Sequence, residues 1–188
     1  LPLPHPATAK GAGTPSASKQ AQRPEMGTSV NALPVPVQEM RDRILAAVRS
    51  GQISELQIPI QWNELPPDFG DINARDAIAQ FKARSADGEG REILAILGNL
   101  LSAPYANVRE GPDIENNKVY IWPYLARTPF QTLGPAEQVL LLGLAPAHVY
   151  TTMKKTGSYP YWSIAIGADG TWHSFRTADS SDKKSTSK

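Results

Sequence analysis

The alternation of apolar and polar positions predicts three helices in the first half of the chain. Apolar residues at positions 37, 40, 44, 45 and 48 lie on one side of a helix, and Gly51 is placed to end it. Residues 72–85 show a second helical pattern of this kind. Residues 91–101 are apolar on nearly every side, which is typical of a helix buried at the centre of a domain.

The segment between the first two helices predicts an extended chain. Isoleucine and leucine recur between residues 53 and 60, and Pro59 restricts such a strand to the edge of a sheet. Pro66 and Pro67 end any regular structure after it. We expect Trp62 to close over the core, and the alternative interpretation is a platform for a ligand.

The second half of the chain combines strands with two short helices. Residues 119–125 are β-branched and aromatic, which predicts a strand, and Pro123 places that strand at an edge or a bulge. The polar residues 105–118 before it are expected to form a loop or an irregular strand. Two short helices are then predicted to open at Pro135 and Pro146, because proline is favoured in the first turn of a helix.

The last apolar residues predict a β-hairpin. Residues 159–167 and 171–176 flank an Ala-Asp-Gly turn at 168–170. Strict alternation assigns Trp172, Ser174 and Arg176 to one face of the second strand, and Thr171, His173 and Phe175 to the other. Together these elements predict an α+β fold, in which a helical layer packs on a small antiparallel β-sheet that ends in a C-terminal hairpin.

Composition separates this domain from two tails. Residues 1–36 include seven prolines and no aromatic residue, so we expect a disordered linker there. Residues 37–178 form a single globular domain in this prediction, and residues 179–188 form a polar tail. Because the chain begins with Leu1 and a proline-rich spacer, we expect that a signal peptide has been removed and that the protein is periplasmic or secreted.

Charge and residue content exclude several function classes. The formal net charge is +1, with 19 basic and 18 acidic residues, so no nucleic-acid partner is expected. The chain has no cysteine, which excludes disulfides and thiolate metal sites. It contains no run of about 18 apolar residues, so we expect no membrane span. The three histidines lack metal-site spacing and no phosphate-binding loop occurs, so no metal or cofactor is expected.

Four stretches of the chain carry a resemblance to a known family. They are ISELQIPIQWNELPPDFGD, SADGEGREILAILGNLL, IENNKVYIWPYLA and YWSIAIGADGTWHSFR. Together they resemble a family of small exported alphaproteobacterial proteins to which no activity is assigned. The resemblance implies an envelope location and transfers no catalytic residue. Separately, the NVREGP stretch at 107–112 is similar to a turn of bacterial SH3-like domains, although those domains continue with strands where this chain continues with helices.

Aromatic residues on the predicted strands suggest a binding surface. We expect Trp162 and Trp172 to lie in the core. Tyr120, Tyr124 and Tyr161 are expected on the opposite face, where they would meet a ligand together with Arg109 of the neighbouring loop. The leading hypothesis is therefore an exported, non-enzymatic domain that binds an envelope protein or a cell-wall glycan.

Two other functions remain open at this point. His173 could act as an acid–base catalyst with Glu110, Asp113 or Glu115, which would make the protein a small hydrolase or lyase. The simpler interpretation of His173 is an ordinary sheet residue, and we favour it. The third possibility is a structural or assembly factor with no discrete pocket.

Overall fold

The chain folds around one antiparallel sheet, seen in a computed structural model that describes residues 23–112 and 117–178. The predictions for residues 1–22 and 179–188, and for Asp113 and Glu115, fall outside the described residues. The sheet has five strands in the order β1-β2-β3-β4-β5, and each strand runs antiparallel to its neighbours. The strands are β1 (Glu25–Gly27), β2 (Tyr105–Arg109), β3 (Lys118–Trp122), β4 (Ser163–Gly167) and β5 (Trp172–Arg176).

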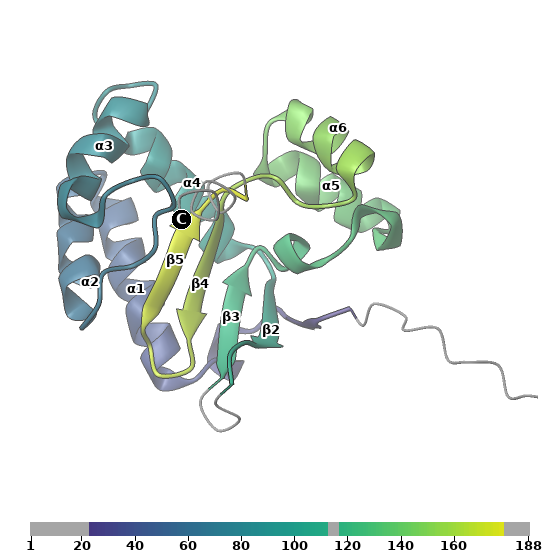
Figure 1. Ribbon diagram of the computed structural model, residues 1–188, viewed down its shortest axis with the longest axis horizontal. Coiled ribbons are helices and arrows are strands. Elements are labelled where there is room, and N and C mark those ends of the chain that lie inside the picture. The colour runs from purple at the N-terminus through teal and green to yellow at the C-terminus, as the bar shows by residue number, and fades with distance from the viewer. Residues whose placement is uncertain (1–22, 113–116, 179–188) are drawn as a thin grey trace, which may run out of the picture.

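Helices cover both faces of the sheet (Figure 1). One group packs a large apolar core against the first face: α1 (Val35–Ser50), α2 (Gln57–Trp62), α3 (Ala77–Arg84) and α4 (Arg91–Ser102). The other group covers the opposite face: α5 (Pro135–Leu144) and α6 (Ala147–Thr156). The predicted α+β class is confirmed, with a helical layer on each side of the sheet.

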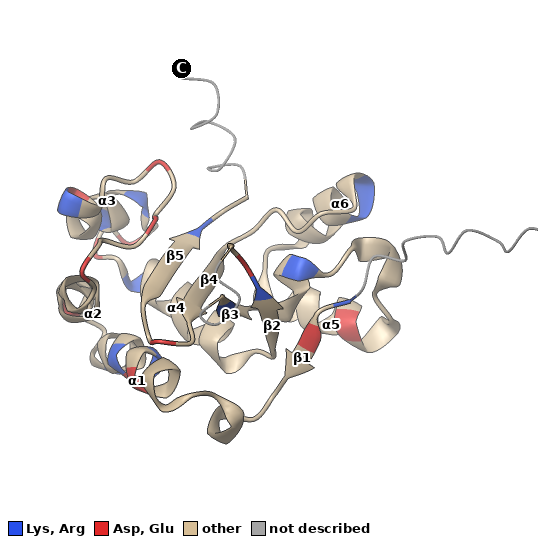
Figure 2. Ribbon diagram, turned by 60° about the horizontal axis from the view of Figure 1, so that its bottom comes forward, with Lys and Arg blue, Asp and Glu red and all other residues tan. Residues whose placement is uncertain are grey.

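Charged residues of both signs are spread over the two helical groups (Figure 2). Arginine and lysine occur on both groups, and aspartate and glutamate are interspersed with them. No helix in the part of the chain that the structure describes is both long enough and apolar enough to cross a membrane.

The segment predicted to be extended is helical. Residues Ile53–Leu56 form a 3-10 helix that leads directly into α2, so the prediction of an edge strand is wrong. Ile53, Leu56 and Ile60 are buried, and their spacing matches one side of a helix. Pro59 is tolerated because it lies in the first turn of α2, where its missing N–H has no helical partner.

Main-chain pairing adds one strand that the sequence did not predict, β1, which pairs with β2. β2 lies in the segment expected to form a loop or an irregular strand, and its pairing with β3 shows that residues 105–109 take the strand alternative. β3 is therefore the central strand, not an edge, and Pro123 follows its last residue. β1 begins at Glu25 and α1 begins at Val35, so the folded domain starts before residue 37. The prediction that the linker extends to residue 36 is therefore wrong.

A β-bulge changes the face on which the β5 side chains lie. Ala165 pairs with Ser174 and Ile166 with Trp172, which leaves His173 as the extra residue. Trp172 and Phe175 consequently both reach the core beneath α1–α4, although strict alternation separated them. The prediction of strict alternation is therefore wrong at this position.

Candidate functional site

The tyrosines expected to meet a ligand are mostly buried. Tyr120 is 5% exposed and packs edge-on against Tyr105, with 5.8 Å between ring centroids. Tyr124 is 3% exposed, within the core beneath α5 and α6. The expected open aromatic face is therefore wrong, because helices cover the parts of the sheet against which Tyr120 and Tyr124 pack. Only Tyr161 remains half-buried, and Arg109 lies exposed at the end of β2.

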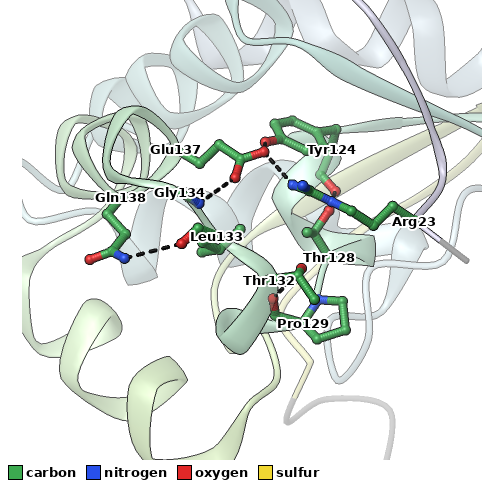
Figure 3. Close-up of polar contacts among 9 residues, drawn as sticks. All are labelled: Arg23, Tyr124, Thr128, Pro129, Thr132, Leu133, Gly134, Glu137 and Gln138. Carbon is green, nitrogen blue, oxygen red and sulfur yellow. Dashed lines mark hydrogen bonds and ion pairs between the residues drawn. The ribbon is translucent and has the colours of Figure 1, made fainter. Parts of the chain in front are cut away.

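Tyr124 instead takes part in a polar cluster at the start of α5 (Figure 3). One carboxylate oxygen of Glu137 accepts hydrogen bonds from the Tyr124 hydroxyl and from Arg23. The other accepts from the Gly134 backbone N–H at 2.7 Å. Burial, together with the hydrogen bond to Glu137, raises the pKa of Tyr124. The cluster joins the segment after β3 and the start of the described chain to the first turn of α5, which is a structural role.

The electrostatics of this cluster predict a pH-dependent stability. Burial opposes ionisation of Glu137, but the hydrogen bonds from Tyr124, Gly134 and Arg23 outweigh it and hold its pKa below the usual range. A lowered pKa adds stability above the unfolded-state pKa of about 4.3, and this stability is lost as the pH falls through the folded-state pKa. Glu137→Gln is therefore expected to lower the free energy of unfolding by about 1–3 kcal/mol at pH 7.

Urea unfolding at several pH values would measure this effect. The difference between the natural protein and Glu137→Gln should shrink below about pH 4, where the carboxylate is protonated. Glu39→Gln is the matched control, because Glu39 is exposed and makes one ion pair of 3.8 Å with Arg43. A gap that stays constant between pH 3 and pH 7 would contradict the role of the charge.

His173 is not paired with the carboxylate proposed for catalysis. Glu110 forms an ion pair with Arg127. Within the described residues, no hydrogen bond or ion pair joins His173 to any carboxylate, and Asp113 lies outside them. The bulged His173 side chain is exposed and lies over Gly167. The described structure therefore contains no His173–Glu110 acid–base pair.

The most exposed aromatic ring belongs to Trp62 at the end of α2. Its exposed fraction is 62%, so the expectation that it closes over the core is wrong. The cause is the helical phase of α2: Ile60 points into the core, whereas Ile58 and Trp62, four residues apart, share the outer side. The guanidinium of Arg43 on α1 lies over the indole, 3.9 Å from the ring centroid.

A hollow of about 420 Å³ lies beside this ring. We call it the Trp62 hollow, and its lining is Trp62, Asn63, Glu64, Leu65, Asp169, Gly170 and Thr171. The loop after α2 forms one wall, and the turn between β4 and β5 forms the other. The hollow therefore brings together two segments that are about a hundred residues apart in the sequence.

Hydrogen bonds fix both walls of the Trp62 hollow. The Asn63 side chain donates to the Trp172 carbonyl at 2.7 Å and accepts from the Trp172 N–H at 3.1 Å. The Asp169 carboxylate accepts from the N–H of Thr171 at 2.9 Å and from its hydroxyl at 3.0 Å. The Asp169 carboxylate and the Thr171 hydroxyl are thus held in defined positions beside an exposed indole, and the exposed Glu64 also lines the hollow.

The sequence pattern contained a signal for this site that the strand interpretation hid. When residues 53–60 are placed on helices, the inward positions of Ile53, Leu56 and Ile60 leave Trp62 outside. The contribution of Asp169 and Thr171 had no such signal, because it depends on where the hairpin turn packs.

Comparisons with known proteins identify no relative. The chain matches no family model, and neither the search of curated proteins nor the search of solved structures found a match. The resemblance to exported alphaproteobacterial proteins therefore stays a prediction. Within the described residues, no group of three or more histidine, aspartate or glutamate side chains is arranged to hold a metal ion.

Proposed function

We propose that this chain is a non-enzymatic binding domain that holds a neutral carbohydrate in the Trp62 hollow. The observation that carries the proposal is an exposed indole, backed by Arg43, at the edge of a hollow with polar walls. The volume of about 420 Å³ falls in the range of about 300–1,000 Å³ found for small-molecule sites. The leading hypothesis of a ligand-binding domain is kept, and its site is moved from the sheet tyrosines to Trp62.

The indole supports stacking against a sugar ring. The face of an aromatic ring carries partial negative charge, and the C–H groups on one face of a pyranose carry partial positive charge. Arg43 packs on the indole and fixes its orientation before a ligand arrives. A ring that is already fixed loses little conformational entropy on binding, and this favours affinity.

The polar groups of the hollow favour a neutral sugar over an acidic one. Glu64 and Asp169 can accept hydrogen bonds from sugar hydroxyls, and the Thr171 hydroxyl can also accept one. The same two carboxylates repel a ligand that carries its own carboxylate. If the predicted export is correct, neutral glycans of the cell wall would be within reach of this site.

Calorimetric titration of the whole chain with neutral and acidic oligosaccharides would test the proposal. Oligomers of glucose and of N-acetylglucosamine are the neutral probes, and oligogalacturonate is the acidic one. We expect saturable binding of at least one neutral series, and at least tenfold weaker binding of the acidic series. If no neutral oligomer binds, or if the acidic one binds equally well, the proposal is wrong, and absence of all binding would favour a structural or assembly role.

A further inference from the structure

A second pocket lies on the other face of the sheet, where α5 and α6 leave part of β4 and β5 uncovered. Its volume is about 150 Å³. The floor consists of small or apolar side chains on three neighbouring strands: Ile121, Ser163, Ala165 and Ser174. Because serine and alanine fill little space, this half of the sheet keeps a depression that larger residues would close. We call it the serine pocket.

Two arginines from different elements line the serine pocket. Arg127 comes from the 3-10 helix Tyr124–Arg127, and Arg176 is the last residue of β5. Each has a carboxylate partner: Glu110 pairs with Arg127, and Asp68 lies 3.0 Å from Arg176. A carboxylate occupies at most two of the five N–H donors of a guanidinium, so each arginine keeps donors for a further acceptor.

Hydroxyl groups complete the donors of the pocket. Tyr161 also lines it, and burial raises the pKa of Tyr161, so that its hydroxyl stays protonated and neutral at physiological pH. In residues 23–112 and 117–178, the side chains of Ser163 and Ser174 make no hydrogen bond to another group. Among the residues that the structure describes, the side chains lining the pocket include no aspartate or glutamate, and the carboxylates of Glu110 and Asp68 reach the two arginines from outside this lining. Guanidinium and hydroxyl donors therefore predominate in the described lining.

We propose that the serine pocket binds a compact oxyanion, namely a phosphate or carboxylate group. The two guanidiniums would supply charge-assisted hydrogen bonds, and the serine and tyrosine hydroxyls would supply neutral ones. This site is independent of the carbohydrate proposal. The Trp62 hollow contains the hairpin turn, whereas Ser163 and Arg176 lie at the opposite end of the same hairpin.

The surroundings of the pocket indicate where a larger ligand would extend. A neighbouring hollow of about 560 Å³ shares Ala126, Arg127, Tyr159 and Ala178 with the serine pocket. It continues along the residues that follow α6, from Thr156 to Ser158. An oxyanion bound at Arg127 and Arg176 could therefore be the charged end of a larger molecule that lies in this second hollow.

Titration of the full chain with sodium phosphate and with sodium acetate, at constant ionic strength set by sodium chloride, would test the proposal. We expect saturable binding of one site for at least one of the two anions. The anion that binds with the higher affinity shows whether the pocket selects a phosphate or a carboxylate group. Arg127→Gln and Arg176→Gln are each expected to weaken binding at least tenfold, whereas Arg75→Gln, at an exposed arginine outside the pocket, should leave it unchanged.

Two further variants keep the test decisive if an arginine variant does not fold. Ser174→Val keeps both charges but fills the floor of the pocket, so it should weaken anion binding at least tenfold with little change in melting temperature. Trp62→Ala should leave anion binding unchanged, because it alters only the Trp62 hollow. Absence of saturable binding by either anion, or binding that Ser174→Val does not weaken, would overturn the proposal.

Discussion

Replacing Trp62 with alanine is expected to weaken the binding of neutral oligosaccharides at least roughly thirtyfold while the protein stays folded. The indole is the aromatic side chain that lines the Trp62 hollow, and truncating an aromatic residue that anchors a ligand typically costs at least about 2 kcal/mol of binding free energy. That loss corresponds to a roughly thirtyfold weaker affinity. Calorimetric titration of the variant beside the natural protein would measure it.

The same substitution should change stability only slightly. Trp62 is 62% exposed, so its main contribution to the folded state is the contact with Arg43. A cation–π contact at an exposed site is worth about 0.5–1 kcal/mol, which corresponds to a decrease in melting temperature of about 1–4 °C for a chain of this size. A loss of binding accompanied by a much larger decrease would show that Trp62 acts through the fold instead.

Ile58→Ala is the matched control for this variant. Ile58 lies on the same outer side of α2 and is 60% exposed, but it does not line the Trp62 hollow. Its replacement should leave oligosaccharide affinity within about a factor of two. An equal loss of oligosaccharide affinity in Trp62→Ala and Ile58→Ala would contradict a site that depends on the indole. It would indicate binding to a general apolar surface.

Gly170→Ala is expected to destabilise the protein by about 2–5 kcal/mol. Gly170 has a positive φ of 88°, a left-handed conformation that costs an L-residue about 1–2 kcal/mol. A Cβ at this position would also lie 2.8 Å from the carbonyl oxygen of Pro36. Because that oxygen belongs to the backbone of α1, relieving the overlap requires the hairpin turn to move, and overpacking of this kind typically costs about 1–3 kcal/mol.

Gly88→Ala separates the cost of a side chain at positive φ from the cost of the contact with Pro36. Gly88 has a similar φ of 67°, but a Cβ there would meet nothing within 4 Å. Its cost should therefore be the conformational part alone, about 1–2 kcal/mol. Urea unfolding of both variants would compare them, and a Gly88 variant as unstable as the Gly170 variant would rule out the contact with Pro36 as a cause. Since Gly170 lines the Trp62 hollow, the Gly170 variant should also bind oligosaccharides more weakly.

Local signals in the sequence were sufficient for most of the helices and for the C-terminal hairpin. Helix α1 has its apolar side and its terminal Gly51, and α5 and α6 have proline in or just before their first turn. These features act within one or two turns of the chain, so neighbouring residues decide them. The prediction was wrong for residues 53–60, where isoleucine and leucine fit a strand and a helix equally well over so short a segment.

The strand pairs that lack an apolar signal could not be predicted in this way. β1 is three residues long, and main-chain hydrogen bonds attach it to β2, about eighty residues later in the chain. Every residue except proline has the same backbone N–H and C=O groups, so no side-chain pattern reveals this pairing. The bulge at His173 could not be predicted from the side-chain pattern either, because it is defined by the register of β5 against β4.

The amino-acid sequence by itself determined the α+β class, the positions of most helices and the hairpin, because each depends on residues close together in the chain. Only the tertiary structure decided which aromatic rings meet solvent. It buried Tyr120 and Tyr124 beneath helices on opposite faces of the sheet, and it left Trp62 outside. It also joined the Asn63 side chain to Trp172, across 109 residues of sequence. Exposure and such long-range contacts depend on which elements pack against each other, and that property belongs to the whole fold rather than to any local pattern.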